Sequence, residues 1–188
     1  MKKYIILLLL ALTGAVAVRA AEDTNAMTPA RFLEIINAPA DAVPLIAPMA
    51  AVPIWPKAVV TNVMTYASGK TFTEVLTNTA HTVQGKYAVF TTHSKYYKKA
   101  MAAVLGYDDK ASALKSYGFY DDGHGGGQIT EGTVVFDFAK KTYTINSTYG
   151  DFEETTTGTY TDTDDVAKTT VFKKGVRFMT RETTTHRL

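Results

Sequence analysis

Residues 57–79, KAVVTNVMTYA-SG-KTFTEVLTNT, form the stretch that decides the fold. Two runs rich in Val, Thr, Tyr and Phe flank the dipeptide Ser68-Gly69. β-Branched and aromatic residues favour extended strands, and Gly in a two-residue connection supplies the backbone conformation of a tight turn. The stretch therefore predicts an antiparallel β-hairpin.

The same residue composition continues from this hairpin to the C-terminus. Short segments rich in Thr, Tyr, Val and Phe alternate with turn residues, at the spacing of about 8–12 residues that is typical of all-β proteins. In the segment 85–94, Tyr87, Val89 and Thr91 fall on one face and Ala88 and Phe90 on the other. No helix of ordinary length fits between the segments, which excludes βαβ units. We expect about eight to ten strands.

Sequential strands with tight turns form a meander, and a long meander closes into an up-and-down barrel because closure removes exposed edges. The sequence thus predicts an all-β fold, an antiparallel up-and-down barrel with one short N-terminal helix. An open sandwich is the alternative.

The residues before the strands divide into two parts. Residues 1–20 carry Lys2 and Lys3, then an apolar run, then small residues ending at Ala20, which is the pattern of a secretory signal peptide. Residues 21–56 hold all six prolines. Within them, MTPARFLEIINA predicts a short helix with Thr28 as N-cap and Pro29 in its first turn. The prolines that follow predict an extended segment packed on the body of residues 57–188 and anchored by Trp55.

The signal peptide predicts a periplasmic or secreted protein with no transmembrane segment after cleavage. Cleavage after Ala20 removes Lys2, Lys3 and Arg19 and no acidic residue, so the net charge of +2 becomes −1. This balance gives no indication of nucleic-acid binding. The chain has no Cys, which excludes disulfides, thiolate metal sites and Cys nucleophiles.

Several motifs together resemble the uncharacterised bacterial family DUF1579. They are Gly85-Lys86-Tyr87, Gly106-Tyr107-Asp108, Tyr117, and Glu131-Gly132-Thr133 followed by Asp137, Lys140 and Lys141, in a match that covers about residues 59–187. The resemblance implies a calycin-type barrel similar to lipocalins, with an internal ligand cavity, and implies no known reaction.

Aromatic side chains on the predicted strands are the candidate ligand-binding residues. Half of them point inward in a small barrel, where they either fill the core or line an apolar pocket with hydroxyl groups at its wall. The candidates are Tyr87, Phe90, Tyr117, Phe119, Tyr143 and Phe172, together with His124.

His124 belongs to the loop YDDGHGGGQ, residues 120–128, whose HGGG spelling is found in lipase oxyanion holes. The chain has no G-x-S-x-G nucleophile elbow and no P-loop lysine, so the loop is interpreted as a hairpin turn at a barrel end. No histidine pair has the spacing of a metal motif, and His93 and His186 are only weak candidates for ligating a metal or haem.

Acidic pairs occur at 108–109, 121–122, 153–154 and 164–165, and their simplest role is turn formation. No catalytic residue and no cofactor is therefore expected. The leading hypothesis is an exported, non-catalytic protein that binds a small hydrophobic ligand inside the barrel. The alternatives are a structural or envelope-interacting module with a packed barrel, and a His-ligated haem-binding barrel.

Overall fold

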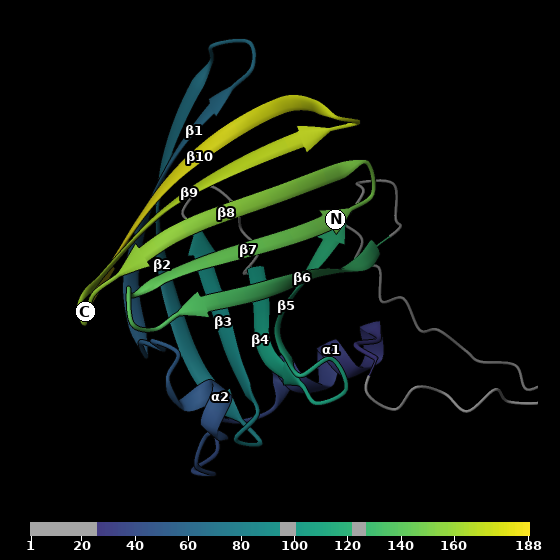
Figure 1. Ribbon diagram of the computed structural model, residues 1–188, viewed down its shortest axis with the longest axis vertical. Coiled ribbons are helices and arrows are strands. Elements are labelled where there is room, and N and C mark those ends of the chain that lie inside the picture. Colours follow the sequence, from purple (N-terminus) through teal and green to yellow (C-terminus); the bar gives the residue numbers. More distant parts are fainter. Residues whose placement is uncertain (1–25, 95–100, 122–126) are drawn as a thin grey trace, which may run out of the picture.

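A computed structural model describes residues 26–94, 101–121 and 127–188. The predicted signal peptide and His124 lie outside these described residues. The described chain contains two helices and ten strands (Figure 1). The elements are α1 (Pro29–Asn37), α2 (Ala47–Ala50), β1 (Lys57–Tyr66), β2 (Thr71–Val83), β3 (Tyr87–Ser94), β4 (Met101–Asp108), β5 (Ala113–Asp121), β6 (Gly127–Asp137), β7 (Thr142–Tyr149), β8 (Phe152–Tyr160), β9 (Asp164–Lys173) and β10 (Val176–Arg187).

The strands form one closed antiparallel barrel in sequence order. Each strand pairs with its neighbour in the chain, and β1 also pairs with β10, from Ala58 opposite Arg187 to Tyr66 opposite Met179. This ladder joins the two ends of the meander and leaves no free edge. The predicted all-β up-and-down barrel is confirmed, and the open sandwich is wrong.

The hairpin that begins the barrel forms as the sequence predicts. Tyr66 and Lys70 close its turn through a backbone hydrogen bond of 2.9 Å, and Gly69 adopts a positive φ of 83°. On β3, Ala88 faces the barrel interior and Val89 faces outward, yet both are fully buried. Val89 is buried because a helix covers this part of the outer wall.

That helix is α1, which packs against the outer surface of the barrel. The Thr28 side chain accepts a hydrogen bond of 3.1 Å from the Arg31 N–H, which confirms the predicted N-cap. Phe32 and Ile35 are buried in an outer cluster with Val83, Val89, Val104 and Tyr117. The part of the outer wall that lies under α1 therefore belongs to the hydrophobic core.

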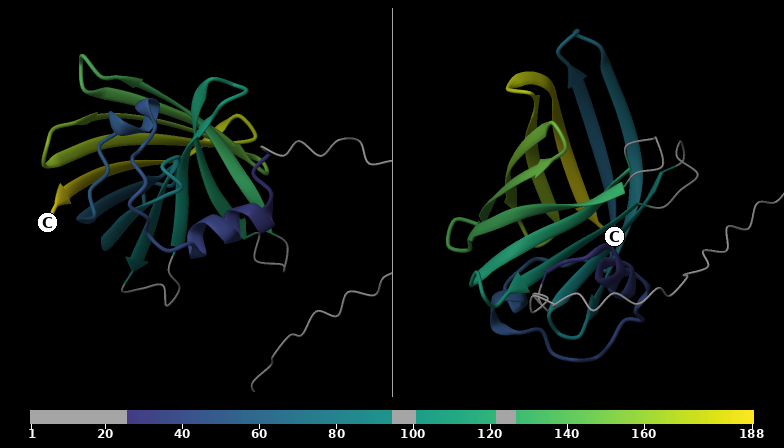
Figure 2. Two further views of the ribbon diagram at one scale, coloured as in Figure 1. Left: turned by 90° about the horizontal axis from the view of Figure 1, so that it is seen from below. Right: turned by 90° about the vertical axis from the view of Figure 1, so that its right-hand side faces the viewer.

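Residues 39–56, here called the strap, cross one end of the barrel (Figure 2). The strap docks on the β2–β3 turn, where the Ile46 N–H donates to the Gly85 carbonyl at 2.8 Å. Gly85 has a φ of 61°, and a Cβ there would lie 2.5 Å from the Pro44 carbonyl oxygen, so the docking requires glycine. The strap contains the short helix α2, which the proline pattern did not predict.

Met49 of α2 fixes the strap to the barrel interior. Its side chain is fully buried, in an inner cluster with Val52, Ala88, Leu105, Leu114 and Val134. The strap thus closes this end of the barrel with apolar side chains. In the described residues, no helix has the length and apolar character needed to span a bilayer.

Neighbouring residues of α1 provide a test of its role in stability. Phe32 is 2% exposed and Leu33 is 54% exposed. We expect Phe32→Ala to lower the free energy of unfolding by about 3–5 kcal/mol, because the cavity it leaves under the helix cannot collapse fully. Leu33→Ala should change it by no more than about 0.5 kcal/mol. Urea denaturation measures both, and equal losses in the two variants would contradict the packing of α1 on the barrel.

Candidate functional site

The interior of the barrel contains a pocket of about 290 Å³ next to the strap. Its wall is mostly apolar and comes from the strap and from strands all around the barrel. The lining residues are Val52, Pro53, Trp55, Ala58, Asn78, Phe90, Ala103, Val104, Leu105, Ser116, Val134, Phe136, Tyr143, Ile145, Tyr160, Asp165 and Thr185. The volume lies at the small end of the range of about 300–1,000 Å³ that ligand pockets occupy.

Several polar groups of the pocket lie together on one side of it. Asp165 on β9 lies opposite Tyr160 on β8 and opposite Thr185 on β10. Tyr143 on β7 reaches the same place, and its hydroxyl donates a hydrogen bond of 3.0 Å to Asp165 Oδ2. A ligand in the pocket would therefore meet one carboxyl group with hydroxyl groups beside it, and a mostly apolar wall elsewhere that also contains the polar side chains of Asn78 and Ser116.

Gly158 allows Tyr143 to reach Asp165. Gly158 lies opposite Tyr143 in the β7–β8 ladder, and a Cβ at this position would come within 2.4 Å of the Tyr143 ring. The ring therefore lies over the glycine, a common way for an aromatic side chain to cover a strand glycine. Phe136 packs against Tyr143 from β6, with ring centroids 5.6 Å apart.

The environment of Asp165 changes the protonation of both partners. Burial raises the pKa of Asp165 from its ordinary value of 3.8 to about 6, although the hydrogen bond from Tyr143 opposes this rise. Burial, and next the negative charge of Asp165, raise the pKa of the Tyr143 hydroxyl. The hydroxyl is thus protonated at all ordinary pH values and acts as a donor to the carboxylate.

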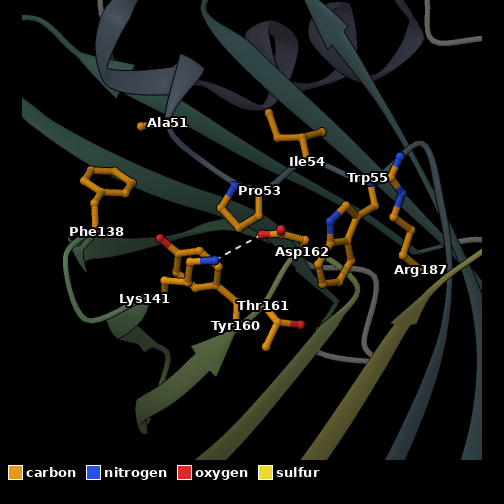
Figure 3. A pocket seen from close by; sticks show the side chains of 10 residues that line it. All are labelled: Ala51, Pro53, Ile54, Trp55, Phe138, Lys141, Tyr160, Thr161, Asp162 and Arg187. Carbon is orange, nitrogen blue, oxygen red and sulfur yellow. Dashed lines mark hydrogen bonds and ion pairs between the residues drawn. The ribbon is translucent and has the colours of Figure 1, made fainter.

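The pocket adjoins an outer groove of about 510 Å³ between the strap and the hairpins at this end of the barrel (Figure 3). Pro53, Trp55 and Tyr160 line both spaces. Beside them the rim carries charge, where Lys141 Nζ lies 3.1 Å from Asp162 Oδ1. The groove and the pocket therefore lie next to each other, with these three side chains at their boundary.

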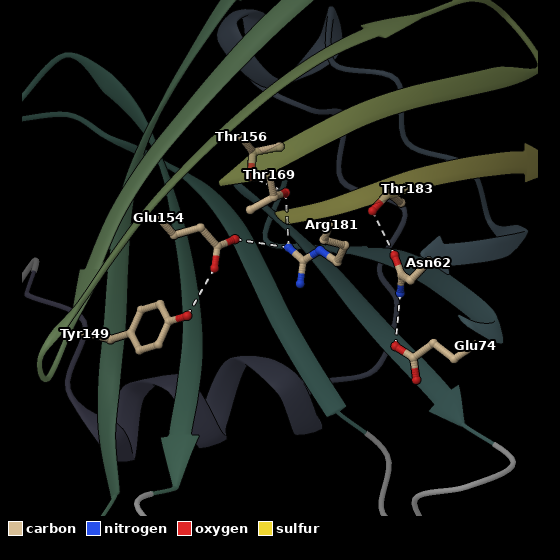
Figure 4. Close-up of polar contacts among 8 residues, drawn as sticks. All are labelled: Asn62, Glu74, Tyr149, Glu154, Thr156, Thr169, Arg181 and Thr183. Carbon is tan, nitrogen blue, oxygen red and sulfur yellow. Dashed lines mark hydrogen bonds and ion pairs between the residues drawn. The ribbon is translucent and has the colours of Figure 1, made fainter. Parts of the chain in front are cut away.

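The remainder of the interior is packed with hydrogen-bonded polar side chains (Figure 4). Arg181 donates to Glu154 at 3.0 Å, and Tyr149 donates to the other oxygen of Glu154 at 3.1 Å. In a second group, Asn62 donates to Glu74 at 3.1 Å and accepts from Thr183 at 2.8 Å. None of these side chains lines the pocket. The interior therefore combines a filled polar region with a pocket beside the strap.

The structure divides the predicted ligand-binding residues between the two faces of the wall. Phe90 and Tyr143 line the pocket. Tyr87 and Tyr117 lie outside the barrel, packed in the outer cluster with α1. Phe119 is 54% exposed, and Phe172 alternates with the inward-facing Val171 and so faces outward. The expectation that these last four side chains line the interior is corrected. For Tyr87 and Tyr117 the physical reason is α1, which makes outward positions beneath it as apolar as inward ones.

The histidine candidates also lie on the outer wall. His93 follows the outward-facing Tyr87 and Val89 at the strand period of two and is exposed. His186 is exposed, and its Nδ1 lies 2.8 Å from Asp164 Oδ1. In the described ranges, no three His, Asp or Glu side chains are grouped to hold a metal ion. The pocket therefore offers no imidazole for a haem iron or a metal from these two residues.

The acidic residues of the interior differ from the prediction. Asp164-Asp165 and Glu153-Glu154 are predicted to form turns, whereas Asp165 reaches the pocket and Glu154 binds Arg181. The turn interpretation is confirmed for Asp108, whose Oδ1 accepts from the Lys110 N–H at 2.9 Å. The missed signal is the strand period of two, which places Asp165 on the same face as the buried Ala167, Thr169 and Val171.

Comparisons with known proteins give no family for this chain. No family model matches it, and no curated protein matches it. The DUF1579 resemblance thus rests on its motifs alone. A similar solved structure is that of an S-type phycobiliprotein lyase from Guillardia theta, with 10% sequence identity, coverage of 87% of this chain and 94% of the other, and a TM-score of 0.46. At this distance the comparison carries no functional argument, and the fold follows from the strand pairing itself.

Asp165→Asn tests the burial of the carboxyl group. A raised pKa means that the folded protein holds the proton more tightly than the unfolded chain, so ionised Asp165 destabilises the fold above about pH 6 and this cost disappears as the pH falls toward 4. Asp165→Asn should therefore raise the free energy of unfolding at pH 8 and have little effect near pH 4. The full pKa difference corresponds to at most about 3 kcal/mol, and solvent access lowers this figure.

The neighbouring Asp164 provides a control of opposite sign. A hydrogen bond from Thr163, and next one from His186, lower the pKa of Asp164. Asp164→Asn should therefore lose stability at neutral pH, and the loss should shrink as the pH falls through the pKa of Asp164. Urea denaturation between about pH 4 and pH 8 measures the free energy of unfolding of both variants.

If Asp165→Asn lowered the free energy of unfolding at pH 8, this result would contradict the burial of a carboxylate that has no cationic partner.

Proposed function

We propose that this protein is an exported, non-catalytic binding protein that holds a small, mainly apolar molecule in the interior pocket. The observation that carries the proposal is the pocket itself, a mostly apolar space of about 290 Å³ lined by the barrel strands and the strap. Small-molecule sites are typically apolar cavities with a few convergent polar groups, and the Tyr143–Asp165 pair supplies such groups here.

The residues that line the pocket support non-catalytic ligand binding rather than catalysis. Among the described lining residues, the titratable groups are Asp165, Tyr143 and Tyr160. These side chains orient a ligand through hydrogen bonds, whereas covalent catalysis requires a nucleophile with an adjacent base. The charge pattern of residues 1–20 supports export, with two lysines before an apolar run.

The competing proposal is a structural module with a packed interior. The polar region of the interior fits that description, because its side chains form hydrogen bonds with one another. The pocket beside the strap does not, because a solid core leaves few voids larger than a water molecule. Ligand binding is therefore favoured over a purely structural role.

Trp55 makes the proposal directly testable. It is the only tryptophan of the chain, and it lines both the pocket and the outer groove. Addition of 1-hexanol, a small neutral amphiphile, should produce a saturable change in Trp55 fluorescence. The change should vanish in Ala103→Phe, because Ala103 lines the pocket and lies opposite Gly118, which leaves space for the larger ring.

Val135→Phe is the matched control, because Val135 lies on the outer wall and is 59% exposed. This variant should keep the response of the unmodified protein. If neither hexanol nor longer alcohols produce a saturable response in folded protein, as judged by circular dichroism, the binding proposal fails and the packed structural module is favoured.

A further inference from the structure

Asp165 has one carboxylate oxygen that nothing in the described chain satisfies. Oδ2 accepts the hydrogen bond from Tyr143, whereas Oδ1 is buried and has no hydrogen-bond partner. A buried polar atom without a partner loses its hydration and gains nothing in return, so each such atom in a native protein requires an explanation. Because Asp165 lines the pocket, the pocket is the side from which a partner can come.

The charge of Asp165 is also unbalanced. Among the described residues, no Lys, Arg or His nitrogen forms an ion pair with it, although its neighbour Asp164 pairs with His186. Glu154, also in the interior, has the guanidinium of Arg181 at 3.0 Å. A buried carboxylate without a cation is costly to a fold. Asp165 is thus an interior acid that lacks the kind of partner Glu154 has.

The remaining wall of the pocket sets the other requirement on a ligand. Besides Asp165, its hydroxyl neighbours, Asn78 and Ser116, the wall is largely apolar and includes Phe90, Leu105, Val134, Phe136 and Ile145. A molecule that fits has an apolar body and one polar end. The chemistry that suits this end is a hydrogen-bond donor with a positive charge, because it satisfies Oδ1 and balances the carboxylate together.

Building on the binding function proposed above, we propose that the ligand is a small apolar amine whose protonated amino group bonds Asp165 Oδ1 while its apolar part fills the pocket. Tyr143 is a positioning residue, since its hydroxyl holds Oδ2 and so orients Oδ1. A carboxylate ligand would meet like charge at Asp165, and an alcohol would supply one hydrogen bond without neutralising the carboxylate.

Glu74 does not provide an alternative site for the amine. It is 7% exposed, and its Oε2 is likewise buried without a partner. However, Glu74 does not line the pocket, and Asn62 holds its other oxygen at 3.1 Å. Of the two unsatisfied carboxylate oxygens, the one on Asp165 belongs to a residue that a molecule in the pocket contacts.

The test compares three six-carbon ligands that differ only in the polar end, namely hexylamine, 1-hexanol and hexanoate, by Trp55 fluorescence titration at about pH 8, where Asp165 is ionised and an alkylamine is protonated. Hexylamine should bind about tenfold or more tightly than hexanol, and hexanoate should bind most weakly. In Asp165→Asn the advantage of the amine over the alcohol should disappear, because the neutral amide carries no charge that attracts the ammonium group. Asp164→Asn should keep the preference, because this carboxylate pairs with His186 on the outer wall.

The outcomes separate this inference from the proposed function. Equal binding of amine and alcohol by the unmodified protein would overturn the amine assignment and leave the apolar pocket established. Retention of the full amine preference by folded Asp165→Asn would also overturn it, because the preference would then arise elsewhere. A lack of saturable binding by all three ligands would overturn the binding function and the amine assignment together.

Discussion

The pairing of β1 with β10 is the constraint on which the rest of the structure depends. It joins strands more than 100 residues apart in the sequence, as in the contact of Thr183 with Asn62, and turns the meander into a closed wall. Without it, β1 and β10 would both present unsatisfied backbone groups at a free edge. Closure also creates the enclosed interior in which Glu74, Glu154 and Asp165 are held away from solvent.

The strap and α1 then decide how that interior is used. α1 covers part of the outer wall of β3 to β6, so that outward-facing side chains such as Val89, Val104 and Tyr117 are buried. The strap closes one end through Met49 and brings Trp55 to the pocket. At the other strands, polar side chains fill the barrel with mutual hydrogen bonds (Figure 4). The pocket thus lies between the apolar side chains of the strap and the hydrogen-bonded polar side chains of the interior. Asp165 lies between these two regions.

The sequence predicts the class of fold well, because the β-branched and aromatic composition of the strands and the residues of the turns are local signals. Thr28 caps α1 and Gly69 turns the first hairpin as their chemistry requires. The site is less predictable, because it depends on which face of each strand points inward. Phe90 and Tyr143 point into the barrel and line the pocket. Tyr87 and Tyr117 point outward, where they pack against α1. No local sequence pattern in these strands indicates that α1 packs on their outer face. Asp165 was assigned to a turn because it sits at a strand end, and only its register opposite Thr185 and Tyr160 brings it to the pocket.

The central claim is that the space beside the strap receives a ligand whose amino end meets Asp165. The most direct measurement is a map of nuclear Overhauser contacts between hexylamine and the protein in solution. We expect contacts from the terminal methyl group to the ring of Phe90, and from the methylene next to nitrogen to the ring of Tyr143, whose hydroxyl donates to Asp165. Contacts to exposed outer-wall residues such as Val75 or Val135, with none to those rings, would contradict it.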